Sequence, residues 1–173
     1  MAAACTVMLL VDPTIFPEDF YGGPVPDASF TLRRRNQFAS PEEMFERFRD
    51  RLPFQRWKPE ILRDYCDYGL LPDGDGFVLA CPPYAEASIY ENSKTPESNI
   101  YPEIAMVKHP VVVMRAGKTR LADVFDLSAS PTSPDLASRF DNGREIVLAE
   151  ASHYIAMEEP ELVVEEIHRL CPW

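Results

Sequence analysis

Three short apolar runs without polar alternation mark the chain. Residues 7–11 are VMLLV, residues 111–114 are VVVM, and a weaker run, REIVLA, covers residues 144–149. Continuous apolar runs of this length, rich in leucine and β-branched residues, are typical of strands buried on both faces of a parallel sheet. A helix is predicted to begin near Pro160, because proline is favoured at the first helical position. Strands that alternate with long connections and end in a helix predict an α/β fold.

The predicted final helix is amphipathic. An apolar stripe at helical spacing is expected to face the protein, and it consists of Val163, Ile167, Leu170 and Cys171. The charged residues of the same helix are expected to face water, namely Glu165, Glu166 and Arg169.

A long insertion, residues 17–105, separates the first two runs and has its own helical signals. Ser40-Pro-Glu-Glu43 is a capping box with proline at the first helical position, so a helix is predicted after Ser40. A second helix is predicted over residues 59–68, ending at Gly69. The sequence LPDGDG at 71–76 predicts a turn between two extended pieces.

A third helix of the insertion is predicted over residues 82–92, with Ala85, Ser88 and Ile89 facing inward. We interpret the chain as a single domain. Residues 1–16 and 106–173 form its core, and residues 17–105 form the insertion.

Composition and charge narrow the classes of function. The chain has 173 residues, 46% of them hydrophobic, which suffices for one domain with a core. Its formal net charge of −11 argues against nucleic acid, since phosphate binding needs basic patches and the one basic run, Arg33–Arg35, is short. Four scattered cysteines without histidine clusters favour free thiols in a cytoplasmic location and predict no metal site. No run approaches the length of a membrane span.

The region around His153 carries a family resemblance. The run at 144–149 is followed by His153 and then by Met157-Glu-Glu-Pro160, which opens the final helix. This order resembles the last strand, catalytic histidine loop and final helix of α/β-hydrolases. Met8-Leu-Leu-Val-Asp12-Pro13 resembles the family's strand after the nucleophile elbow, and residues 110–117 resemble the next strand. The resemblance implies a partial α/β-hydrolase fold with the last three parallel strands, a helical lid over residues 17–105 and a C-terminal helix.

The resemblance assigns His153 as the general base and leaves the nucleophile missing. Family members carry the serine in a G-x-S-x-G elbow, but none of the seven glycines of this chain brackets a serine at that spacing. The acid is expected in the loop after the second strand, where Asp123 is favoured over Asp126. Asp12 is the alternative acid position, although V-D-P is also typical of a turn that ends a strand. Retention of His153 without a present role is the competing interpretation.

Ester or acyl hydrolysis by a Ser-His-Asp triad is therefore the activity that the resemblance implies, without a cofactor and with a small apolar ester or acyl substrate. A chain without the nucleophile is expected to be inactive alone. Alternatives are an enzyme completed by a partner chain and a non-catalytic binding or scaffold module. The sequences of residues 16–21 and 126–132 most resemble those of fungal α/β-hydrolases, some from toxin or other specialised-metabolite pathways.

The first apolar run raises a question of stability. Without the strands that precede it in the family, residues 7–11 form an edge strand, and long apolar edges favour self-association or pairing with a partner. We expect the isolated chain to be marginally stable, oligomeric or dependent on a partner.

Overall fold

A computed structural model describes residues 7–118 and 128–171. The chain forms two compact units. The first combines Met1–Gly22 with Pro96–Trp173, and the second is Gly23–Thr95.

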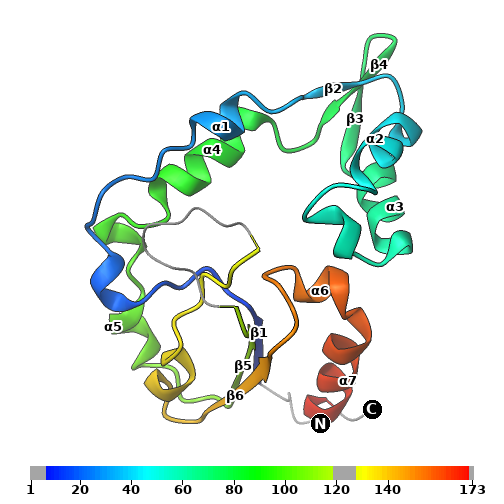
Figure 1. Cartoon of the computed structure of the whole chain (residues 1–173). Coiled ribbons are helices and arrows are strands. Elements are labelled where there is room, and N and C mark those ends of the chain that lie inside the picture. Colours follow the sequence, from blue (N-terminus) through cyan, green and yellow to red (C-terminus); the bar gives the residue numbers. More distant parts are fainter. Residues whose placement is uncertain (1–6, 119–127, 172–173) are drawn as a thin grey trace, which may run out of the picture. The chain divides into compact units, whose positions relative to one another are not determined.

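The first unit is built on a parallel sheet of three strands, which Figure 1 shows side by side. The strands are β1 (Met8–Val11), β5 (Val111–Ala116) and β6 (Gly143–Leu148), in the order β1-β5-β6. Met8 pairs with Val111 and Val111 with Gly143. This sheet confirms the predicted α/β class and the three strands expected from the apolar runs.

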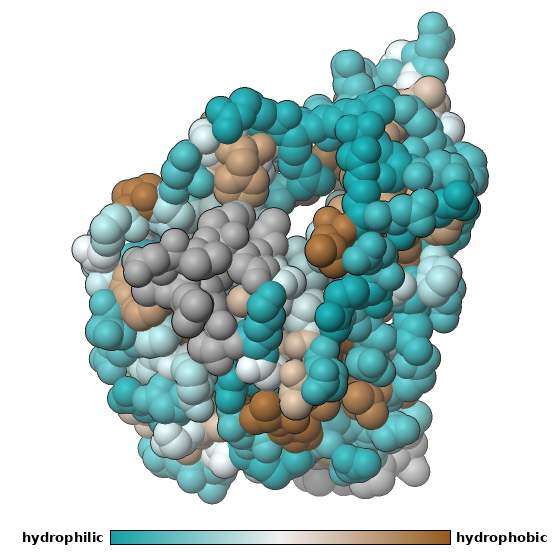
Figure 2. Space-filling view, viewed as in Figure 1, coloured by the Kyte–Doolittle hydropathy of each residue, from teal (hydrophilic) through white to brown (hydrophobic). Residues whose placement is uncertain are grey.

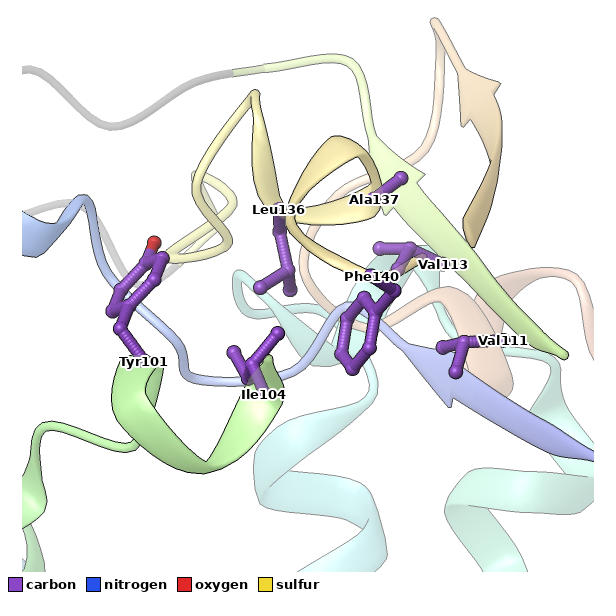
Figure 3. Packing of buried hydrophobic residues seen from close by; sticks show 7 residues of the cluster. All are labelled: Tyr101, Ile104, Val111, Val113, Leu136, Ala137 and Phe140. Atoms are coloured by element: carbon purple, nitrogen blue, oxygen red, sulfur yellow. The ribbon is translucent and has the colours of Figure 1, made fainter. Parts of the chain in front are cut away.

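Both faces of the central strand β5 are covered by apolar side chains. Val111 and Val113 point to one face, where α5 (Tyr101–Ile104) and the short 3₁₀ helix η4 (Leu136–Arg139) pack. Figure 3 shows the buried cluster on this face, in which Leu136 projects between Tyr101 and Phe140. Such two-sided burial explains why this strand is continuously apolar in sequence.

The opposite face of the sheet is covered by the C-terminal helices α6 (Ile155–Glu158) and α7 (Pro160–Leu170). Met114 and Ala116 of β5 pack there with Ile155, and the half-buried Val163 of α7 packs against the same cluster. The alternation of β5 side chains between the two clusters fixes the register of the sheet, since a slip by one residue would exchange the faces.

The predicted orientation of the final helix is wrong at two positions. Glu166, expected to face water, is 1% exposed, whereas Ile167 is 40% exposed. The physical reason is an ion-pair cluster, in which the Glu166 carboxylate contacts Arg144 of β6 and Arg169 of its own helix. A buried carboxylate needs such partners, and they turn the helix so that Glu166 faces the sheet.

The second unit contains four α-helices and a small antiparallel sheet. Its helices are α1 (Ser29–Leu32), α2 (Pro41–Phe48), α3 (Pro59–Tyr68) and α4 (Pro83–Asn92). Its sheet has the order β2-β4-β3, with β2 (Gln37–Phe38), β3 (Leu70–Asp73) and β4 (Gly76–Leu79). The described residues also contain three further 3₁₀ helices, namely η1 (Glu18–Phe20), η2 (Phe54–Arg56) and η3 (Pro96–Ser98).

Local signals of the insertion are confirmed where they depend on caps and turns. The Ser40 hydroxyl accepts a hydrogen bond from the Glu43 N–H at 3.1 Å, which caps α2. Helix α3 ends at Gly69, and the residues between β3 and β4 form the expected turn. Each of these signals is local in sequence, so neighbouring residues suffice to satisfy it.

The inward face predicted for α4 is wrong, because Ala87 is the buried residue while Ile89 is 65% exposed. Contacts with α1 and the residues after it set the orientation of α4. Glu86 forms an ion pair with Arg34, and the Tyr90 ring lies 6.1 Å from that of Phe30. The basic run is thus engaged within the chain.

Within residues 7–118 and 128–171, no helix is long and apolar enough to cross a membrane. The face shown in Figure 2 is mostly hydrophilic, and its hydrophobic patches are small and separate. This surface agrees with the net charge of −11.

Replacing Leu136 by alanine is expected to lower the free energy of unfolding by about 2–5 kcal/mol, because the side chain is fully buried and leaves a cavity. Urea denaturation measures the loss. Met106→Ala is the control, since Met106 is 70% exposed and its truncation removes little packing. Equal losses in the two variants would contradict the packing described for the first cluster.

Burial raises the pKa of the Cys66 thiol to about 11, so at pH 8 almost none of it is thiolate, the form that reacts with alkylating reagents. We expect iodoacetamide to modify the exposed Cys81 first and Cys66 only as the pH approaches 11 or the protein unfolds. Both cysteines lie in one tryptic peptide, residues 64–94, so tandem mass spectrometry that localises the label within this peptide measures both rates. Comparable rates at pH 8 under native conditions would exclude the burial of Cys66.

Candidate active site

Two residues with catalytic potential meet at one end of the parallel sheet. Asp12 directly follows β1, and His153 lies in the loop that follows β6. Because the strands are parallel, the segments after them leave the sheet at the same edge, where ligands of α/β proteins generally bind. The Asp12 carboxylate Oδ2 lies 2.7 Å from the Nδ1 of His153.

The Asp12 carboxylate is fully buried and holds several segments together. Its Oδ1 accepts hydrogen bonds from the Ala116 N–H at 2.8 Å and from the Ser130 hydroxyl at 2.7 Å. The Thr132 hydroxyl lies farther away, at 3.4 Å. These donors leave Oδ2 directed at the imidazole.

The backbone of Asp12 adopts a left-handed conformation with φ of 42°. Aspartate and asparagine tolerate this region better than other non-glycine residues, because their short polar side chains bond locally. The Asp12 N–H still donates to the Met114 carbonyl at 2.7 Å, which extends the pairing of β1 with β5 by one bond. The chain therefore turns sharply after that bond, where the V-D-P pattern predicted the end of a strand.

His153 is held by its backbone and its ring but remains accessible. Its N–H donates to the carbonyl of Ser128 at 2.9 Å, and its side chain is 29% exposed while that of Asp12 is 0% exposed. With the Nδ1–H donating to the carboxylate, Nε2 has its lone pair available to accept a proton. This is the arrangement of a general base oriented by an acid.

A close approach of two strands supports the site. A Cβ added to Gly117 would lie 2.5 Å from the Cα of Ala149, closer than real Cβ contacts. The Gly117 N–H donates to the Leu148 carbonyl at 2.8 Å, so the ends of β5 and β6 stay together just before the His153 loop. The glycine at this position thus keeps the histidine loop next to the end of β5.

The serines suggested by the loop sequence have structural partners. Ser130 and Ser133 are each 1% exposed, and their hydroxyls donate to Asp12 and Asp135 respectively. Ser128 Oγ accepts from Lys118 Nζ at 3.2 Å. In the part of the chain that the structure describes, no serine, threonine or cysteine side chain is hydrogen-bonded to the His153 ring.

Of the candidate acids, Asp12 is the one that the structure brings to His153. Asp123 and Asp126 lie outside the described residues, so their assignment stays a prediction. The signal for Asp12 was present in sequence as an aspartate directly after the first strand. Its hydroxyl donors, Ser130 and Thr132, lie more than a hundred residues away and could not be assigned from the sequence.

Across the described ranges, no group of three or more histidine, cysteine, aspartate or glutamate side chains is placed to hold a metal ion.

Comparisons with known proteins extend this picture. No protein-family model and no curated protein sequence matches the chain. Among solved structures, it resembles the peroxisomal α/β-hydrolase Lpx1 from Saccharomyces cerevisiae, with a TM-score of 0.69 and 17% identity over 94% of this chain and 46% of that one. It also resembles E-2-(acetamidomethylene)succinate hydrolase, with a TM-score of 0.60 and 16% identity over 87% and 55% of the two chains.

A third similar structure is N-formylmaleamic acid deformylase from Pseudomonas putida S16, with a TM-score of 0.56 and 18% identity over 93% of this chain and 56% of that one. At these identities the likeness concerns the fold, and the fold is that of α/β-hydrolases. The chain spans about half the length of these solved structures. Its fold is therefore a partial one, as the sequence predicted.

Replacing Asp12 by asparagine is expected to reverse the tautomer of His153. Asparagine tolerates the backbone conformation and still offers an Oδ1 acceptor, but its amide would donate to Nδ1 and so place the ring proton on Nε2. Ring ¹⁵N chemical shifts of the isolated chain measure the tautomer. Asp141→Asn, at an exposed aspartate of the same unit, is the control; a wild-type tautomer in Asp12→Asn would show that the pair is not formed.

Proposed function

We propose that the chain carries the base and the acid of a serine-type acyl hydrolase. His153 is the general base, and Asp12 holds its tautomer and stabilises the imidazolium that forms when a proton is taken up. The single observation that carries the proposal is the 2.7 Å contact between a fully buried carboxylate and a partly exposed imidazole at the carboxyl ends of parallel strands. The α/β-hydrolase fold of the similar structures supports the same chemistry.

The nucleophile must come from polypeptide other than the described residues. A hydroxyl attacks an acyl carbon only when a base takes its proton, and no described hydroxyl or thiol is bonded to the His153 ring. The chain alone is therefore proposed to be inactive. A segment with G-x-S-x-G, in the same polypeptide or in a partner, would place its serine against Nε2 of His153, and a small apolar ester or acyl compound would be the substrate.

The edge of the parallel sheet is the proposed point of attachment. In the sheet of the described residues β1 pairs with β5, and its four residues are half-buried while all six of β5 are buried. An additional parallel strand on β1 would extend the sheet next to Asp12 and bring new side chains to the site. Alternatively, the same edge of β1 would pair with a second copy of this chain.

Three further attributes belong to this proposal. The insertion, residues 17–105, is proposed to act as a lid. A cytoplasmic location is supported by the free thiols of Cys66 and Cys81. A role as an accessory in fungal specialised-metabolite or toxin biosynthesis is supported by the resemblance of residues 16–21 and 126–132 to the sequences of fungal α/β-hydrolases.

The proposal is tested by supplying the missing nucleophile. Full-length cDNA sequencing shows whether an in-frame G-x-S-x-G segment precedes Met1, and that segment, or a separately encoded one, is combined with the chain. We expect hydrolysis of p-nitrophenyl butyrate and fluorophosphonate labelling only in the combined protein. His153→Ala should lower kcat/KM by about 10⁴-fold or more.

The matched control is His168→Ala, because His168 is an exposed histidine of α7 and its loss should leave turnover unchanged. Fluorophosphonate labelling of the chain alone, or full activity of the His153→Ala variant, would overturn the proposal. A non-catalytic binding role predicts instead that a bound acyl ligand is retained equally by wild-type and His153→Ala chains.

A further inference from the structure

A second buried carboxylate lies close to the candidate site but does not contact its reacting groups. Glu158, the last residue of α6, is 6% exposed, and its side chain folds back onto the loop that precedes the helix. Its two oxygens accept from two donors of one residue: Oε2 from the Ser152 N–H at 3.0 Å, and Oε1 from the Ser152 hydroxyl at 2.5 Å. Ser152 is itself 3% exposed and directly precedes His153.

The same hydroxyl also reaches the residue that follows His153. The Ser152 Oγ accepts a hydrogen bond from the Tyr154 N–H at 3.3 Å. Because this oxygen donates its own proton to Glu158, the carboxylate is linked to the peptide groups on both sides of His153. The Glu158 side chain, four to six residues farther along, therefore holds the backbone on both sides of His153, in addition to the bond from the His153 N–H to the Ser128 carbonyl.

Hydrogen bonds to a buried charge are strong, because neither partner can be replaced by water at low cost. The loop has little other regular structure, since it lies between β6 and a helix of four residues. The orientation of the imidazole toward Asp12 depends on where the loop backbone places its Cα. An error of 1 Å there would break a 2.7 Å contact.

We infer that Glu158 is a positioning residue for His153, which it holds in register with Asp12 through the Ser152 amide and hydroxyl. The inference rests on the proposed function for its catalytic meaning, but its structural content concerns the isolated chain. In the sequence, the residues that form these contacts are a serine directly before the histidine and a glutamate five residues after it.

The test is ¹⁵N NMR of the full chain with labelled histidine, with the His153 signal assigned from a His153→Gln variant. In the wild type we expect the proton on Nδ1, bound to Asp12. In Glu158→Ala the ratio of the Nδ1–H to the Nε2–H form should fall by about tenfold, the effect of roughly 1.4 kcal/mol. Hydrogen exchange of the peptide that contains Ser152 should accelerate by a similar factor.

The matched control is Glu166→Gln, since Glu166 is an equally buried glutamate of the same unit whose partners, Arg144 and Arg169, lie away from the loop. It should lower overall stability without changing the His153 tautomer. Ser152→Ala removes the hydroxyl but keeps the amide donor, so a smaller shift in the same direction is expected.

An unchanged tautomer and unchanged exchange in folded Glu158→Ala would overturn the inference. If that variant does not fold, Glu158→Gln and Ser152→Ala decide: the inference is overturned when both are folded and both retain the wild-type ratio. The readouts need no substrate, so an inactive reconstituted hydrolase would refute the proposed function and leave this result standing. Conversely, if the reconstituted hydrolase is active and the His153 tautomer is unchanged in Glu158→Ala, only the inference is refuted.

Discussion

The burial of the Asp12 carboxylate is the constraint on which the first unit depends. An ionised carboxylate removed from water is expensive unless donors surround it, and the donors come from distant parts of the chain. Ala116 supplies a backbone N–H from the end of β5, Ser130 supplies a hydroxyl, and His153 supplies its ring. Satisfying one side chain therefore brings together the segments that follow all three strands of the parallel sheet.

The histidine loop shows the same principle with a second carboxylate. Asp12 fixes the ring of His153, while Glu158 fixes the peptide groups around it. The two carboxylates act on different parts of one residue, so the ring direction and the Cα position are set separately. In its proposed role as general base, a histidine held in both ways has little freedom to lose when it takes up a proton, which is the condition for efficient proton transfer.

The sequence predicted those features that are encoded locally or by periodicity in a buried strand. The runs at 7–11 and 111–114 predicted β1 and β5, and the Ser40 cap predicted α2, because neighbouring residues satisfy these elements. It failed for helix faces. Glu166 was expected to face water because it is charged, and periodicity carries no information about its ion-pair partner Arg144, which lies 22 residues away.

For a related reason, the sequence did not decide between Asp12 and the loop aspartates Asp123 and Asp126 as the acid partner of His153. An aspartate before a proline is equally typical of a turn, and the residues that distinguish the two roles, Ser130 and Thr132, follow it by more than a hundred positions. The relation of His153 to a strand end was predictable, because it depends on order along the chain. The hydrogen bonds of Glu158 with Ser152 could not be predicted, because they depend on the conformation of the loop, which no periodic pattern describes.

The two oxygens of Asp12 have separable roles. The contacts of Oδ1 with Ala116 and Ser130 require an acceptor alone, and an asparagine in the same left-handed conformation would provide it. The contact of Oδ2 with His153 is different, because only a carboxylate both selects the Nδ1–H tautomer and stabilises the protonated ring. Packing of the loops would be satisfied by either residue, so the carboxylate at position 12 is explained by its effect on His153.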